Sequence, residues 1–171
     1  MTDLSAANQP SPAPVTFRCD TLPEDRQRVR EIVESTGFFS AAEVDVAVEL
    51  VDERLTKGDA SGYYFVFAEL DGRTVGYSCY GPIPATAASY DLYWIAVDRD
   101  CQGRKVGRIL LEESERLIRA AGGRRLYLDT SSRTQYQPTR DFYEHFRFRC
   151  EAVLEDFYAP GDGKVIYVKV L

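Results

Sequence analysis

A basic, glycine-containing loop occupies Gln102 to Gly107, with the sequence Gln-Gly-Arg-Lys-Val-Gly. An apolar run precedes it and a helical pattern follows it. The loop therefore exposes the free amides and the positive dipole end of a helix, both of which favour phosphate. Its glycines let the backbone approach a ligand closely. The loop predicts a phosphate site, although it fits neither the Walker pattern nor the dinucleotide-binding fingerprint. Three cationic side chains complement a polyanion: Arg104, Lys105 and Arg108.

Other side chains that could take part in catalysis lie close to this loop or follow it in the sequence. Cys101 adjoins the loop, but a free cysteine is commonly buried and inert. His145 is the only histidine, and it follows Tyr143 by two residues, so the two face different sides of a helix. Tyr143 taken alone is typical of core packing, as aromatic residues at helical spacing usually are. The four cysteines form no C-x-x-C pair and have no histidine at ligand spacing, so we expect no metal site and four free thiols.

The elements around the loop form a β-α-β unit. Tyr90 to Val97 is nearly all apolar after Asp91, which is typical of a central strand that is covered on both faces. A helix then runs from near Gly107 to Ala121, where Gly122-Gly123 ends it. Arg125 to Thr130 is the next strand. Because a crossover helix joins them, we expect the two strands to be parallel.

The remaining elements complete a mixed sheet. Residues 1–14 have no periodicity and predict a disordered tail before a single domain at 15–171. Val15 to Arg18 is a strand; helices follow from Pro23 to Gly37 and, capped by Ser40 with Glu43, to Gly58. Four more strands and a short helix are expected, and the hairpin signal Asp71-Gly72 joins the first two of these strands. The predicted fold is α/β (α+β), with about seven mostly antiparallel strands and four helices. These strands are Tyr63–Leu70, Thr74–Tyr80, Glu151–Tyr158 and Val165–Val170, and Pro138 opens the short helix.

This arrangement resembles the GNAT superfamily of N-acetyltransferases from about Val15 to the C-terminus. The family's acetyl-CoA motif reads Gln/Arg-x-x-Gly-x-Gly/Ala, and here Gln102, Gly103, Val106 and Gly107 fit it. The lead-in Trp94-Ile95-Ala96-Val97-Asp98 and the later Phe142-Tyr143-Glu144 also look like the family. Three positions depart from it. Lys105 replaces the motif's first glycine, so we expect its backbone to suit an ordinary residue; Tyr136 replaces a frequent asparagine, and Arg147 replaces a glycine.

The resemblance implies acetyl-CoA as co-substrate and no metal. In the family the central strand and the strand after the crossover helix splay apart, and pantetheine pairs with backbone groups of the first. Ile95 and Val97 occupy those positions. The amides from Gln102 to Arg108 would hold the pyrophosphate, and Arg104, Lys105 or Arg108 would meet the 3′-phosphate or stay solvated. Tyr136 and Tyr143 would also border the cofactor.

The resemblance also implies direct transfer of the acetyl group to an amine. Tyr143 matches the tyrosine that protonates the departing thiolate. The general base stays open among three carboxylates near the family's usual position, and a water chain without a single base is a fourth option. The three candidates are Asp91, Glu69 and Asp129.

The acceptor is expected to be a small primary amine such as an amino acid or a short peptide. Arg133 and Arg140 are candidate carboxylate ligands, and the candidate lining of the acceptor pocket is aromatic: Tyr80, Tyr93 and Tyr158. The acidic helices near Glu43 to Asp59 favour a polyamine or aminoglycoside instead. Two other functions stay open, a non-catalytic acyl-CoA sensor and an acyltransferase that uses a longer chain.

The charge and composition of the chain argue against some functions and some cellular locations. The 171 residues carry a net charge of −6, which argues against nucleic-acid binding. No run of about 20 apolar residues predicts a membrane span, and the N-terminus does not resemble a signal peptide, so we expect a cytoplasmic protein. The final strand either pairs with a second chain, which would give a homodimer, or pairs only with Glu151–Tyr158.

Overall fold

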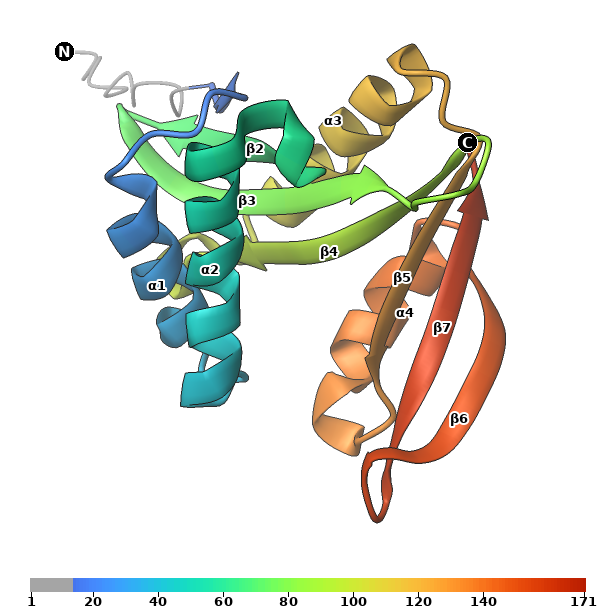
Figure 1. The fold of residues 1–171 in the computed structure, drawn as a ribbon. Coiled ribbons are helices and arrows are strands. Elements are labelled where there is room, and N and C mark those ends of the chain that lie inside the picture. Colours follow the sequence, from blue (N-terminus) through green and yellow to red (C-terminus); the bar gives the residue numbers. More distant parts are fainter. Residues whose placement is uncertain (1–13) are drawn as a thin grey trace, which may run out of the picture.

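The computed structural model describes residues 14–171 as seven strands, four α-helices and three short 3-10 helices in the predicted order (Figure 1). The predicted tail at 1–14 lies, apart from Pro14, outside the described residues. The helices are α1 (Asp25–Thr36), α2 (Ala41–Lys57), α3 (Val106–Ala120) and α4 (Gln137–His145). The strands are β1 (Thr16–Arg18), β2 (Tyr64–Leu70), β3 (Arg73–Pro82), β4 (Ser89–Val97), β5 (Arg125–Ser131), β6 (Arg149–Ala159) and β7 (Asp162–Val170).

The seven strands form one sheet in the order β1-β2-β3-β4-β5-β7-β6. As predicted, β4 and β5 are parallel, and every other neighbouring pair is antiparallel. The parallel pairing extends only from Ser89 opposite Arg125 to Asp91 opposite Tyr127. Beyond it β4 and β5 diverge, and Figure 1 shows them as the two arms of a V. The carboxyl half of β4 therefore pairs with β3 on one side and with no strand of residues 14–171 on the other.

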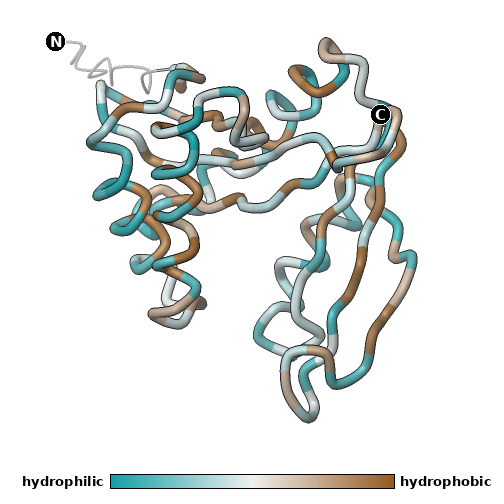
Figure 2. Tube along the Cα trace, in the orientation of Figure 1, coloured by the Kyte–Doolittle hydropathy of each residue, from teal (hydrophilic) through white to brown (hydrophobic). Residues whose placement is uncertain are grey.

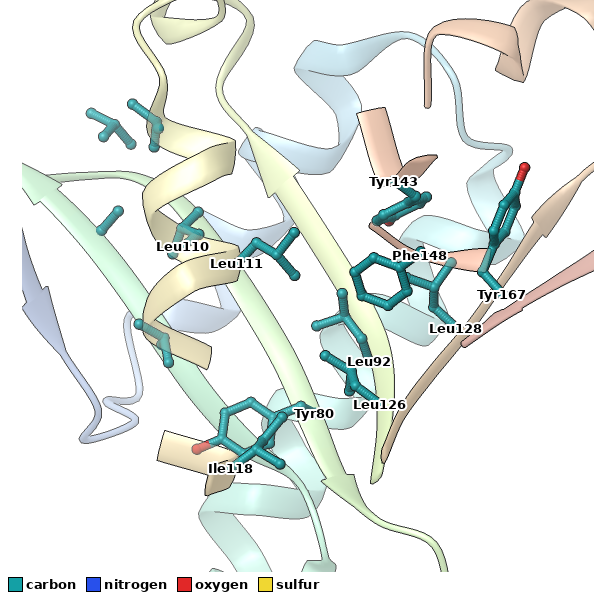
Figure 3. Close-up of a cluster of buried hydrophobic side chains, with 14 of the residues drawn as sticks. Tyr80, Leu92, Leu110, Leu111, Ile118, Leu126, Leu128, Tyr143, Phe148 and Tyr167 are labelled. Atoms are coloured by element: carbon teal, nitrogen blue, oxygen red, sulfur yellow. The ribbon is translucent and has the colours of Figure 1, made fainter. Parts of the chain in front are cut away.

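Helices cover both faces of the sheet because neighbouring strand residues point to opposite faces. Phe65 and Phe67 of β2 pack with α1 and α2, whereas Val66 and Ala68 pack with α3. The hydrophobic core on the α3 side of the sheet extends to Tyr143, Phe148 and Tyr167, which lie beside β5 (Figure 3). Along α1 and α2 hydrophobic and hydrophilic segments alternate, as expected for helices with one buried face (Figure 2).

Local signals in the sequence account for several boundaries. The Ser40 hydroxyl accepts from the Glu43 amide while the Glu43 carboxylate accepts from the Ser40 amide, which is the predicted capping box. Asp71 and Gly72 have φ values of 52° and 75°, as the tight turn of the β2–β3 hairpin requires. A bulge shifts the β3–β4 register, with Cys79 opposite Trp94 but Tyr80 opposite Leu92. Tyr93 is the extra residue, and the shift re-aims every later side chain of β4.

The structure corrects the expectation about the edge of the sheet. The final strand β7 lies between β5 and β6, so it offers no free edge to a second chain. The edge strand at this end of the sheet is β6, where Val153, Leu154, Phe157 and Tyr158 are exposed. No helix in residues 14–171 combines the length and apolar character needed to cross a membrane.

Candidate active site

The carboxyl half of β4 has backbone groups that face the side on which no strand of the described residues pairs with it. Opposite residues of an antiparallel pair alternate between hydrogen-bonded and non-bonded positions. The Asp98 amide donates to the Val75 carbonyl at 2.8 Å, and Val97 and Ile95 face Gly76 and Ser78 of β3 in the register. By this alternation, Ile95 and Val97 are non-bonded positions, so their amides and carbonyls point away from β3. These are the two backbone positions that the sequence predicted for pantetheine.

The loop after β4 forms the N-terminus of α3. The first bond of the helix runs from the Ile109 amide to the Lys105 carbonyl at 3.1 Å, so the amides of Val106, Gly107 and Arg108 have no intrahelical partner. The first turn contains no acidic side chain, and the helix dipole is therefore uncompensated there. Gln102 Nε2 donates to the Val97 carbonyl at 3.3 Å, which ties the loop to the end of the strand.

Lys105 does not have the ordinary backbone that was expected of it. Its φ is 64° and its ψ is 10°, in the left-handed region. Glycine adopts this conformation freely, but a side chain makes it costly. The tertiary structure thus keeps a glycine-like backbone at this position of the motif although the sequence supplies a lysine. Arg147, the other replacement of a family glycine, also has a positive φ, of 67°.

A cleft of about 610 Å³ is lined by this loop and by the two diverging strands, β4 and β5. β4 contributes Tyr93 to Val97, the loop contributes Gln102, Gly103 and Lys105 to Arg108, and β5 contributes Asp129 and Thr130. Gly107 faces the cleft, because a Cβ there would lie 3.7 Å from Val97 and 3.8 Å from Phe142, both of which line it. The remaining lining residues are Cys101 and residues of α4 and its lead-in, of the end of α1 and of the segment between α1 and α2. Arg104 is not among the lining residues.

Tyr143 reaches the cleft from α4 and is 7% exposed. Burial raises the pKa of its hydroxyl well above the usual value for tyrosine, and the negative charge of Asp129 adds to the rise. The phenol therefore keeps its proton at neutral pH, which is the state a general acid needs. Its ring packs edge-to-face on Phe142 and on Phe148. Tyr143 therefore both packs in the core, as its sequence context indicated, and lines the cleft.

The three candidate bases lie in different surroundings. Asp129 lines the cleft; its Oδ2 accepts from the Tyr158 hydroxyl at 2.7 Å, and Lys164 Nζ lies 3.1 Å from its Oδ1. Asp91 lies outside the lining, and burial followed by the charge of Asp129 raises the pKa of its carboxyl. Glu69 is bound by Arg18 Nε at 2.8 Å and is separated from β4 by β3. Of the three candidates, Asp129 alone lines the cleft.

Of the three tyrosines that were predicted to line the acceptor pocket, two lie at the cleft and one does not. Tyr93 lines the cleft, and Tyr158 borders it through Asp129. Tyr80 stacks on Tyr64 in the core next to α3, so it does not reach the cleft.

Both predicted arginine ligands are used by the fold, and neither lines the cleft. Arg140 donates to the Ser131 carbonyl at 2.7 Å and to the Arg133 carbonyl at 3.0 Å. Arg133 lies 3.0 Å from Asp162 Oδ2. These contacts hold both guanidinium groups against the protein itself, and the role of Arg133 and Arg140 as substrate-carboxylate ligands stays a prediction.

Sequence reasoning missed the segment between α1 and α2. Phe38 and Phe39 line the cleft, and the Tyr136 hydroxyl donates to the Phe38 carbonyl at 3.3 Å. Phe39 packs on Trp94 of β4 with ring centroids 5.1 Å apart. The one signal in the sequence was two adjacent aromatic residues after a helix-ending glycine.

The other reactive side chains divide between the cleft and the rest of the protein. Cys101 lines the cleft, and His145 does not. Residues 14–171 contain no cluster of His, Cys, Asp and Glu suited to a metal ion.

Comparison with known proteins adds a second line of evidence. The model of the Acetyltransferase (GNAT) family matches residues 26–148. A solved structure of a GNAT-family protein from Desulfovibrio desulfuricans is 53% identical, with a TM-score of 0.90, and covers 92% of this chain and 99% of its own. No curated protein sequence matches the chain.

Two more distant structures share the fold. The ribosomal-protein-S18-alanine N-acetyltransferase of Escherichia coli is 18% identical with a TM-score of 0.73, covering 92% of this chain and 94% of its own. The PaiA N-acetyltransferase of Thermoplasma acidophilum, in complex with coenzyme A, is 18% identical with a TM-score of 0.66, covering 91% and 99%.

Proposed function

Because the chain belongs to the GNAT family of acetyltransferases, we propose that it transfers the acetyl group of acetyl-CoA to the primary amine of a small molecule. The observation that carries this proposal is the cleft in which the free amides at the N-terminus of α3 meet Tyr143 and Asp129. The amides suit a phosphate donor, and the two side chains suit proton transfer at an amine and a thiolate.

The residues of the cleft fit acetyl-CoA. The amides of Val106, Gly107 and Arg108 would bind the pyrophosphate, with Lys105 and Arg108 adding positive charge. The backbone groups of Ile95 and Val97, which have no partner strand, would pair with the amides of the pantetheine arm. The missing Cβ of Gly107, between Val97 and Phe142, leaves room for a chain to pass. Gln102 would release the Val97 carbonyl when the ligand binds.

Acetyl-CoA supplies the reactive thioester, and the protein supplies two proton positions. Asp129, which lines the cleft, receives a proton from the acceptor ammonium, directly or through water. The C–N bond then forms as the C–S bond breaks. Tyr143, whose pKa is raised by burial, gives its proton to the departing sulfur. The new amide nitrogen loses its second proton, which returns through water to the Tyr143 phenolate, and Asp129 releases the first proton to solvent. Tyr158 and Lys164 hold the Asp129 carboxylate in place.

The acceptor side supports an amine with a compact apolar body. Phe38, Phe39, Tyr93 and Tyr136 form an aromatic wall, and Asp129 is an anionic group at its edge. An aromatic surface and a carboxylate together favour an ammonium ion. The E. coli structure is named for an alanine acceptor on a ribosomal protein, but 18% identity carries only the fold.

A screen of primary amines with acetyl-CoA tests the proposal. Thiol release followed at each amine, with the product identified by mass, should find at least one acetylated amine. Asp129→Asn should lower kcat on that amine and leave acetyl-CoA binding intact. Acetyl-CoA binding with no turnover on any amine would favour a sensor, and turnover only with longer acyl donors would identify a different acyltransferase.

A further inference from the structure

A second cleft, of about 730 Å³, lies at the far end of α3 from the phosphate-binding loop. It is bounded by the carboxyl half of α3, the end of α4, the start of β5 and the end of β7. It shares no lining residue with the candidate active site. Its volume falls in the range of small-molecule sites.

The lining of this cleft is cationic although the protein is acidic. Five Arg and Lys side chains face two Glu side chains, in a chain whose net charge is −6. The five cations are Arg119, Arg125, Arg147, Arg149 and Lys169. Cations gathered in one concave surface repel each other, and they focus a positive potential that attracts anions.

Among the residues that the structure describes, carboxylates balance three of these five cations and leave two without a partner. Glu115 has a side chain only 6% exposed and is bound by Lys169 and by Arg119 at 3.1 Å. Glu112 accepts from Arg108 at 2.8 Å, and Arg108 belongs to the other cleft. Arg149 is paired with Glu151. Within residues 14–171, no carboxylate lies within 4.0 Å of Arg125 or Arg147, so these two guanidinium groups are available to a ligand.

Apolar side chains complete the cleft. Phe146 is half-buried and lines it together with Val168 and Val170. A ligand that joins phosphate groups to an organic ring would match both parts, because guanidinium groups bind phosphate bidentately and a ring can pack on Phe146. Free inorganic phosphate would use only the charged part.

We propose that this cleft binds a phosphate-bearing organic anion of about nucleotide size, separately from acetyl-CoA. Arg125 and Arg147 would bind the phosphates, and Phe146 and Val170 would contact the ring. The site involves no residue of the proposed acetyl transfer, so its occupancy does not require that activity.

Isothermal titration of magnesium-free ATP into protein saturated with CoA tests the proposal. We expect binding that weakens as salt is raised. The double variant R125Q/R147Q should raise the Kd about tenfold or more, since it removes two charge-assisted contacts. The control variant R30Q/R116Q removes two arginines that line neither cleft and should leave the Kd unchanged. Thermal melting without ligand verifies that both variants are folded.

Three results would overturn the second site: no ATP binding to the CoA-saturated protein, an unchanged Kd in R125Q/R147Q, or competition between ATP and CoA. The last would place the phosphates in the active-site cleft. Titrations without CoA keep the two proposals apart. If CoA itself failed to bind, the proposed function would fail, whereas loss of ATP binding in R125Q/R147Q would still support the second cleft.

Discussion

The amide of Phe148 donates to the carbonyl of Tyr143 at 3.0 Å, and the two rings pack edge-to-face with centroids 5.6 Å apart. The Arg147 amide donates to the Glu144 carbonyl at 2.9 Å. These two bonds and the ring contact form a Schellman motif at the end of α4. The proposed acid is therefore held by the turn that ends its own helix, and that turn requires a left-handed residue at Arg147.

Replacing Arg147 by glycine should stabilise the protein. Its φ of 67° costs about 1 kcal/mol for a residue with a side chain, and glycine removes most of this cost. We expect Arg147→Gly to raise Tm by about 2–4 °C, measured by thermal denaturation. Arg147→Ala is the control, because alanine also removes the guanidinium but keeps the strain, and it should give no such gain. An equal rise in both variants would mean that charge, not backbone strain, sets the effect.

Tyr143→Phe should separate chemistry from binding. The substitution removes the hydroxyl and keeps the ring that packs on Phe142 and Phe148. If Tyr143 is the acid, kcat should fall by about 10²- to 10⁴-fold, while the Kd for acetyl-CoA stays within about twofold of wild type. Thiol release and calorimetry measure the two quantities. Tyr64→Phe, in the core away from the cleft, should leave both unchanged. An unaltered kcat in Tyr143→Phe would assign that residue to packing alone.

Much of the fold could be predicted because its signals are local. Asp71-Gly72 supplies both left-handed residues of a hairpin, and Ser40 with Glu43 begins α2. The strand-helix-strand order also predicts that β4 and β5 are parallel, since a crossover helix must return the chain in the same direction.

The parts that the sequence could not predict depend on contacts between distant residues. Glu69 has the chemistry of a base, but Arg18, 51 residues earlier, binds it. Arg140 has the chemistry of a carboxylate ligand, but it satisfies loop carbonyls that arise only in the folded chain. Lys105 adopts a backbone that its residue type disfavours, because tertiary structure can override intrinsic preference.

Gly107→Val should weaken cofactor binding without unfolding the protein. A Cβ at this position would make ordinary contacts, 3.7 Å to Val97 and 3.8 Å to Phe142, so the free protein has room for it. The γ-methyl groups of valine would extend into the space between those side chains. We expect the Kd for acetyl-CoA to rise about ten- to hundredfold, the equivalent of about 1–3 kcal/mol of overpacking. Gly107→Ala should keep most of the affinity, and both variants should melt close to wild type. Tight binding by the valine variant would mean that acetyl-CoA does not pass between Val97 and Phe142.

Asp91→Asn should stabilise the protein at neutral pH and lose that advantage in acid. Burial, and then the charge of Asp129, raises the pKa of Asp91 above its ordinary value of 3.8. The folded state thus binds this proton more tightly than the unfolded state does. The stability that this contributes is fully present below pH 3.8 and is lost as pH rises through the higher pKa of the folded state.

At pH 7 the wild type therefore carries the penalty of a half-buried carboxylate, and asparagine does not. Because solvent screens a half-buried group, we expect a gain below about 1 kcal/mol, or up to about 2–4 °C in Tm. Thermal or urea denaturation of both proteins between pH 8 and pH 4 measures the difference, which should shrink as pH falls. A difference that grew in acid would mean that the folded state stabilises the Asp91 carboxylate. Burial would then not be the main influence on the pKa of Asp91.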